Sequence, residues 1–219
     1  DPAMSAGGSA GLDATAEVER LRRRFERERK VREEAEAIAE SSTRQLFDRQ
    51  RELELLVAVA RAAIEADEPG AGLAAVLGAL CESGGFSIAQ LYMVEGGRHL
   101  RISELWHTVD RVRFGDFRHA SEEPNFESGL GLPGRALRER NPVVIADVIG
   151  DPRFFRQEAA RMCAVRGAVA FPVDRGGEVL AVVELFATST VSDEASLIAT
   201  AEALGSLLGR LVERARAKP

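Results

Sequence analysis

The chain has 219 residues, with 29 Lys and Arg against 35 Asp and Glu, so its formal net charge is −6. Hydrophobic residues make up 45% and charged residues 29%, which is typical of a folded soluble protein and excludes a collagen-like or wholly disordered chain. The net acidity argues against a nucleic-acid-binding protein, and no apolar run approaches the ~20 residues that a membrane span needs. We therefore expect a cytoplasmic protein with no nucleic-acid or membrane partner, and its two cysteines, Cys81 and Cys163, suit a reducing compartment.

The N-terminal part of the chain predicts a flexible leader followed by a long helix. Residues 1–16 are rich in Gly, Ala and Ser, which favours disorder, and the three residues before Met4 resemble a vector remnant. From Glu17 to about Ala66 there is neither Gly nor Pro, and strong helix formers dominate. A heptad pattern predicts a parallel coiled coil over 17–52, and hence a homodimer. The expected interface residues in this helix are Val18, Leu21, Phe25, Leu46, Leu53 and Leu56.

The middle of this coiled coil is weakly specified. Several heptad core positions are polar, namely Glu28, Arg32, Ser42 and Arg49. Val31 and Ile38 lie beside the core positions and support a second register. Two registers separated by a few kcal/mol would suit a helix that transmits a signal. The alternative is that the polar positions only set the orientation and number of the helices.

The next segments predict a second helix and most of a sheet. Glu68-Pro69-Gly70 ends the long helix, and a short amphipathic helix is expected over 73–80. Apolar segments 86–94 and 100–107, joined by Glu95-Gly96-Gly97, predict a β-hairpin whose second strand places Leu100, Ile102, Glu104 and Trp106 on one face. Residues 108–130 show no clear period. A short helix over 134–140 and a strand over 143–148 follow.

The last third of the chain predicts two helices and a second pair of strands. Asp151 is expected to cap a helix that Pro152 begins, and strands 168–173 and 179–187 are expected to be joined by a tight turn. Ser192 should cap a final amphipathic helix. Its apolar residues again follow heptad spacing, so Leu197, Leu204, Leu208 and Leu211 join the expected dimer interface. The order of elements indicates an α+β fold with a mostly antiparallel sheet.

Several motifs in residues 129–187 resemble the GAF family of small-molecule sensor domains. They are Gly131-Leu132-Pro133-Gly134-Arg135, Asn141-Pro142-Val143-Val144-Ile145, Asp151-Pro152-Arg153-Phe154, Phe171-Pro172-Val173 and Val183-Glu184-Leu185-Phe186. The resemblance extends over roughly 53–213 and implies an antiparallel sheet sandwiched by helices. The N-terminal helix resembles the signalling helices that precede such domains in bacterial histidine kinases and diguanylate cyclases.

The resemblance implies a dimeric sensor module that relays a signal through its terminal helices to an effector. Residues 53–213 would be the sensor domain, and 214–219 would lead toward an output domain, which is covalent or separate. The signal would be an unknown small molecule or would come from upstream. The alternative is a dimerisation and relay domain that binds no ligand.

The candidate pocket residues are mostly aromatic. In the resembled family, the region between 106 and 155 forms the lid of the pocket, and the candidates are Trp106, Phe114, Phe117, Phe126, Phe154 and Phe155, together with Tyr92, Cys163 and Glu184. The alternative for the aromatic residues is a small secondary core. Glu184 lies in an apolar strand and needs a partner, which is either a ligand or an Arg. The alternative for Cys163 is a small packing residue.

No cofactor, metal or catalytic motif is identified. The three histidines and two cysteines lack the spacing of a zinc site, although a single His remains open as a haem ligand. The cysteine of bilin-binding GAF domains and the motif of cyclic-nucleotide-binding ones have no counterpart. A GAF-fold methionine sulfoxide reductase would need reactive thiols, and the cysteines are too few and wrongly placed. We therefore expect a protein that is not an enzyme.

Overall fold

The computed structural model describes residues 8–122 and 126–217, with side chains described from Glu17 onward. The chain divides into two units, residues 1–50 and 51–219. In the first unit the described residues form the beginning of helix α1 (Gly8–Glu65), and every side chain from Glu17 to Gln50 is exposed. Helix α1 begins at Gly8, within the predicted leader 1–16, and residues 1–7 lie outside the described part of the chain.

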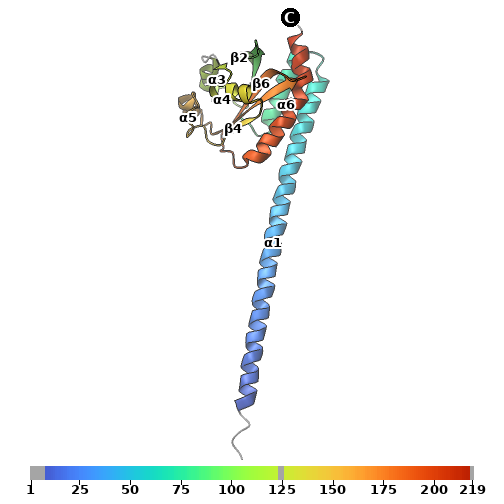
Figure 1. Ribbon diagram of the computed structural model, residues 1–219, viewed down its shortest axis with the longest axis vertical. Helices are drawn as coiled ribbons and strands as arrows, with labels where there is room; N and C mark the ends of the chain where they lie inside the picture. The colour runs from blue at the N-terminus through green and yellow to red at the C-terminus, as the bar shows by residue number, and fades with distance from the viewer. Residues whose placement is uncertain (1–7, 123–125, 218–219) are drawn as a thin grey trace, which may run out of the picture. The chain divides into compact units, whose positions relative to one another are not determined.

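The second unit is built on a six-stranded sheet in which every neighbouring pair is antiparallel (Figure 1). The strand order is β3-β2-β1-β6-β5-β4. The strands are β1 (Ile88–Glu95), β2 (His99–Thr108), β3 (Phe126–Glu127), β4 (Val143–Ile145), β5 (Gly167–Arg175) and β6 (Glu178–Ala187). The β1–β2 and β5–β6 turns each contain a pair of glycines with positive φ, which allows the tight hairpins that the sequence predicted.

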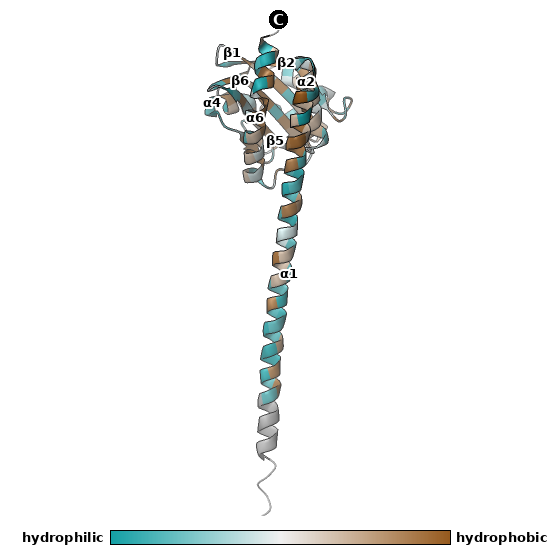
Figure 2. Ribbon diagram, turned by 90° about the vertical axis from the view of Figure 1, so that its right-hand side faces the viewer, coloured by the Kyte–Doolittle hydropathy of each residue, from teal (hydrophilic) through white to brown (hydrophobic). Residues whose placement is uncertain are grey.

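Helices cover both faces of this sheet. The last turns of α1, α2 (Pro69–Glu82) and α6 (Glu194–Arg216) pack on one face, and α3 (Gly115–Glu122), α4 (Gly131–Glu139) and α5 (Gln157–Cys163) pack on the other. Along β6, Val183 and Leu185 point toward the first face, whereas Val182 and Phe186 point toward the second. Because both faces are covered, the central strands are apolar along their whole length, and hydrophobic residues gather on α2 and β5 in Figure 2.

Two predicted helix starts are wrong. Asp151 does not cap a helix: its Oδ1 accepts a hydrogen bond from the Arg153 backbone N–H (2.9 Å) in a local turn, and α5 begins only at Gln157. Asp193, not Ser192, caps α6, because its side chain accepts from the backbone N–H of Ser196 (2.9 Å). Helix α3 and strand β3 lie in residues 108–130, where no period predicted them.

The apolar residues of α6 face the chain's own sheet rather than a free surface. Leu204, Leu208 and Leu211 are buried, and Leu197 is half-buried against the same core. The prediction that they line a dimer interface is therefore wrong for the three buried leucines, since a helix on a sheet shows the same three-four spacing as a coiled coil. In the described part of the chain, α6 alone has the length and composition of a membrane span, but 44% of its apolar stretch is buried in this fold.

Close packing also marks α6 and the end of α1. A Cβ at Gly205 or Gly209 would collide with the carbonyl oxygen of Pro172 or Asp174, so the backbone of α6 lies directly on β5. Leu56, expected at the dimer interface, is half-buried and packs on the core that includes its neighbour Leu55. Part of the predicted dimer interface of α1 is therefore covered by the core of the same chain.

A bulge in β2 changes which residues face each side. Gln90 pairs with Trp106 and Tyr92 pairs with Ile102, so three residues of β2, 103–105, lie opposite one residue of β1. Glu104 is consequently exposed in the bulge, and its predicted place on one face with Ile102 and Trp106 is wrong.

Candidate functional site

Most of the candidate pocket residues lie in one buried cluster between the sheet and helices α3, α4 and α5. Its members from the sequence prediction are Tyr92, Phe114, Phe117, Phe126, Phe154 and Cys163, and Glu184 lies among them. Trp106 is partly buried and packs against the cluster. Phe155 is 58% exposed, so its predicted place in the pocket is wrong; it precedes α5 with its side chain turned outward.

Glu184 forms a buried ion pair with Arg156. The carboxylate is 0% exposed in the middle of β6, and its Oε1 and Oε2 accept from Nη2 (2.5 Å) and Nη1 (3.0 Å) of Arg156, the residue before α5. The Tyr92 hydroxyl donates a further hydrogen bond to Oε2 (3.0 Å). Two donor groups therefore hold both oxygens of the carboxylate, which is the arrangement that a buried charge requires.

Four aromatic rings surround the guanidinium group of Arg156. Its Cζ lies 5.0–5.4 Å from the ring centroids of Phe117, Phe126, Phe154 and Phe186. The faces of aromatic rings carry partial negative charge, so they stabilise a desolvated cation. Three of these rings, those of Phe117, Phe126 and Phe154, were suggested by the sequence for a ligand, and they instead enclose a side chain of the protein itself.

A chain of hydrogen bonds extends from Arg156 to strand β2. Arg156 Nη1 donates to Ser121 Oγ (2.9 Å), which also accepts from Gln90 Nε2 (3.3 Å). Arg118 donates from Nη1 to Gln90 Oε1 (3.3 Å) and from Nη2 to the carbonyl oxygen of Ser103 in the β2 bulge (3.1 Å). We call these residues, with Tyr92 and Glu184, the core network. Among the described residues no buried side-chain nitrogen or oxygen lacks a partner, so the network is closed.

Electrostatics fix the protonation states of Tyr92 and Arg156 in the core network. Burial raises the pKa of Tyr92 well above its usual value and the neighbouring Glu184 raises it further, so the phenol remains a neutral donor. Burial would lower the pKa of Arg156, but Glu184 and Tyr92 outweigh it and raise that pKa, which keeps the guanidinium charged. Tyr92 and Arg156 therefore both keep their protons near neutral pH.

The two thiols are placed unfavourably for redox chemistry. Burial raises the pKa of Cys81 to about 12 and also raises the pKa of Cys163, so neither forms a thiolate near neutral pH. Cys81 lies on the α2 side of the sheet and Cys163 on the α5 side. The thiols are both free, and the sheet separates them.

Sequence reasoning required a partner for Glu184 but could not identify Arg156. One signal in the sequence does point to the core network: Gln90 is a polar residue inside an apolar strand, just as Glu184 is, and the two are direct neighbours across β1 and β6. Ser121 and Arg118 lie in α3, in the segment without a clear period, and no pattern singled them out.

Comparison with known proteins identifies the family. The sequence profile described as GAF domain matches residues 71–213. No match was found among curated protein sequences.

Solved structures with the same fold include GAF domains of other proteins and an enzyme. The A. aeolicus nlh2 GAF domain in an inactive state is 22% identical with a TM-score of 0.61, covering 76% of this chain and 98% of that one. The GAF domain of a phosphoenolpyruvate-protein phosphotransferase (ptsP) from Coxiella burnetii is 18% identical with a TM-score of 0.62, covering 77% and 96%. Free methionine-R-sulfoxide reductase from Neisseria meningitidis, in complex with its substrate, is 16% identical with a TM-score of 0.59, covering 77% and 92%. At these low sequence identities, the similarity to the solved structures establishes the fold of the chain and nothing further.

Proposed function

Because the chain belongs to the GAF domain family, we propose that it is a homodimeric regulatory module that relays a signal through its helices to an effector. The proposed location is the cytoplasm, and the proposed effector is of the histidine kinase or diguanylate cyclase type, attached to this chain or separate from it. The observation that carries this proposal is an apolar stripe on α1 that the chain itself leaves exposed.

In the first unit, this stripe follows the heptad pattern. Val18, Leu21 and Phe25 are exposed near the beginning of the helix, and Leu46 is exposed near the end of the unit. Charged side chains flank them in pairs such as Arg24–Glu28 (3.0 Å) and Arg23–Glu19 (3.3 Å). An apolar seam between balanced charges is typical of a helix that associates with a second copy of itself.

In the second unit, the exposed stripe differs from the heptad core expected from sequence. Leu53, Val57 and Ile64 are 58%, 60% and 81% exposed, whereas Leu55 and Val59 are buried against the sheet domain. The domain occupies one side of this part of α1, so a second helix would pack on the side that carries Leu53, Val57 and Ile64. The proposed interface is revised accordingly, and Leu56 no longer belongs to its centre.

The closed core network favours the relay role over small-molecule sensing in the core. Arg156 fills the aromatic enclosure where a ligand was expected, and its charge is already compensated by Glu184. A small molecule could enter only by displacing a bidentate ion pair, which is costly to break. We therefore place the proposed input outside the core network. The two buried, separated thiols agree with a module that performs no thiol chemistry.

Light scattering tests the dimer. A mass near twice 23.7 kDa is expected at tens of micromolar, and a monomer at that concentration would refute the proposal. Val57→Glu should produce a monomer, since it places a charge in the seam. Val109→Glu is the matched control because Val109 is also 60% exposed but lies outside the helices. Equal behaviour of the two variants would mean that the stripe is not the interface.

Cysteine cross-linking tests the relay. Single cysteines introduced at Val31 and at Arg32 should each form an intermolecular disulfide, because a parallel seam with two registers brings either position against its counterpart. The native thiols are buried and should not compete. Cross-linking at only one of the two positions would indicate a static coiled coil and would remove the two-register mechanism.

A further inference from the structure

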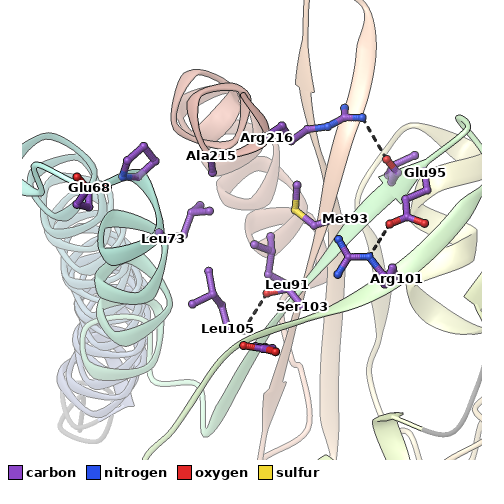
Figure 3. Close-up of a pocket in the computed structure, with 14 residues that line it drawn as sticks. Glu68, Leu73, Leu91, Met93, Glu95, Arg101, Ser103, Leu105, Ala215 and Arg216 are labelled. Carbon is purple, nitrogen blue, oxygen red and sulfur yellow. Dashed lines mark hydrogen bonds and ion pairs between the residues drawn. The ribbon is translucent and has the colours of Figure 1, made fainter. Parts of the chain in front are cut away.

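A groove of about 670 Å³ lies on the sheet face that carries α2 and α6, on the opposite side from the core network (Figure 3). Its walls are the start of α2, strands β1 and β2 and the last turn of α6. Figure 3 shows Leu73, Leu91, Met93 and Leu105 converging on it from α2, β1 and β2. Its size is within the range of small-molecule sites, and apolar side chains form its floor.

The polar rim of the groove has an uncompensated negative charge. Both cations are engaged: Arg101 Nε lies 2.5 Å from Glu95 Oε1, and Arg216 Nη1 lies 3.3 Å from Glu178 Oε1. Among the described residues, the carboxylate of Glu104, in the β2 bulge, forms neither a hydrogen bond nor an ion pair. The bulge presents this carboxylate beside the apolar floor instead of in the regular strand.

We propose that this groove binds a small organic cation with an apolar body, of the alkylammonium or arylammonium class. The apolar body would lie on Leu73, Leu91, Met93 and Leu105, and the ammonium group would pair with Glu104. An anion would have to compete with Glu95 and Glu178 for the two arginines and would meet the carboxylate of Glu104, so charge complementarity favours a cation.

The groove is also connected to the core network and to the end of α6. The carbonyl oxygen of Ser103, at the start of the bulge, accepts from Arg118 of the core network (3.1 Å). Arg216, in the last turn of α6, donates to the carbonyl oxygen of Val94 in β1 (3.4 Å). A ligand in the groove would therefore contact both the bulge and the end of α6, and this second consequence rests on the proposed relay function.

Methionine methyl NMR of the full chain tests binding directly. The chain has three methionines; Met93 lines the groove, and Met162 is exposed on α5 and provides an internal control. Titration with 4-phenylbutylamine should shift the Met93 methyl resonance in a saturable way and leave that of Met162 unchanged. The neutral 4-phenylbutanol and the anionic 4-phenylbutyrate have the same apolar body, and they should bind more weakly in that order.

Two variants separate the contributions of charge and space. Glu104→Gln should lower the affinity for the amine about fivefold, the upper end for an exposed ion pair, and leave the alcohol unaffected. Glu202→Gln, at an exposed α6 position outside the groove, is the matched control. Gly70→Leu should weaken both ligands by about tenfold, because its side chain displaces buried methylene groups that are each worth about fourfold. A Cβ at Gly70 meets nothing within 4 Å, so the fold should tolerate this change.

Three results would overturn the proposal. The first is no Met93 shift at about 10 mM amine, well above a Kd of ~1 mM. The second is equal shifts at Met93 and Met162, and the third is tighter binding of the anion than of the amine. Failure of the dimer or cross-linking tests would refute the relay function but leave groove binding standing, since binding is measured at Met93 alone.

Discussion

Replacing Glu184 with Gln is expected to lower the free energy of unfolding by about 3–5 kcal/mol, because it leaves the charge of Arg156 buried without its counter-ion. Arg156 is 5% exposed and cannot reach solvent without moving α5. Domains of this size are typically stable by about 5–15 kcal/mol, so the variant should fold but unfold at a much lower denaturant concentration.

The interactions that Arg156 keeps determine where in this range the loss of unfolding free energy falls. After the substitution, Arg156 would still donate to Ser121 Oγ (2.9 Å) and would still face four aromatic rings. Cation–π contacts contribute about 0.5–2 kcal/mol each when the cation is desolvated. A loss near 3 kcal/mol is therefore more consistent with this geometry than one near 5 kcal/mol.

A second substitution distinguishes the effect of an unpaired buried charge from general damage to the core. Arg156→Met alone should cost about as much as Glu184→Gln, since it leaves the carboxylate unpaired. The double variant should cost less than either single variant, because Met is apolar and the Gln carbonyl still accepts from Tyr92. This non-additivity is the signature of a coupled buried pair.

Urea denaturation measures all three variants, with the fluorescence of Trp106, the single tryptophan, and circular dichroism as independent probes. Glu178→Gln is the control, because it removes the partner of Arg216 in an exposed pair and should cost less than about 1 kcal/mol. The reasoning fails if Glu184→Gln costs no more than this control, or if the costs of the two core substitutions simply add.

Two further predictions concern packing and acid stability. Gly205→Ala should lower the free energy of unfolding by about 1–3 kcal/mol, because its Cβ would collide with the Pro172 carbonyl. Gly70→Ala is the control, because a Cβ there meets no neighbouring atom. Equal urea midpoints for the two variants would contradict close packing of α6 on β5. Hydrogen bonds from Arg166 lower the pKa of Asp147 in the folded state, so this carboxylate stabilises the protein above the unfolded pKa of about 3.9, and that stability is lost as the pH falls through the folded value. The melting temperature of Asp147→Asn should therefore lie below that of the wild type at pH 6 and approach it in acid, and a constant difference across pH would exclude this linkage.

Local signals in the sequence predicted most of the sheet. Paired glycines at 96–97 and 176–177 marked both hairpins, and the apolar runs between them marked the central strands. These signals work because turn geometry and strand burial depend on a few neighbouring residues. The β2 bulge could not be predicted, since the carbonyl oxygen of Ser103 at its start accepts from Arg118, in a helix that no periodicity indicated.

The apolar pattern of α6 predicts a coiled coil wrongly, and the reason is physical. Leu204, Leu208 and Leu211 recur every three or four residues, as they would in a coiled coil, but they pack on β5 and its neighbours. Periodicity identifies the apolar face of a helix and does not identify what covers it. The glycines at 205 and 209 were the distinguishing signal, because small residues on an apolar face permit the close approach of a backbone.

The candidate site was predicted in outline only. An apolar strand containing Glu184 implied a buried carboxylate, and clustered aromatic residues implied an apolar enclosure around it. Neither pattern could show that Arg156 fills the enclosure, because an arginine reaches its partner through a long side chain from a segment without regular structure. Long-range ion pairs of this kind depend on the tertiary fold and leave no spacing in the sequence.

The position of Arg156 determines how cooperatively the domain opens. Helix α5 has seven residues, too few to be stable alone, and it lies in a stretch between β4 and β5 that would ordinarily fluctuate as a surface loop. Arg156 directly precedes the first residue of α5, and its side chain is anchored to Glu184 in the central strand β6. The segment therefore cannot detach without exposing Glu184 and four aromatic rings. We therefore expect the amide protons of α5 to exchange through the same opening event as those of β6, so that hydrogen exchange would find this peripheral helix protected as well as the core strand.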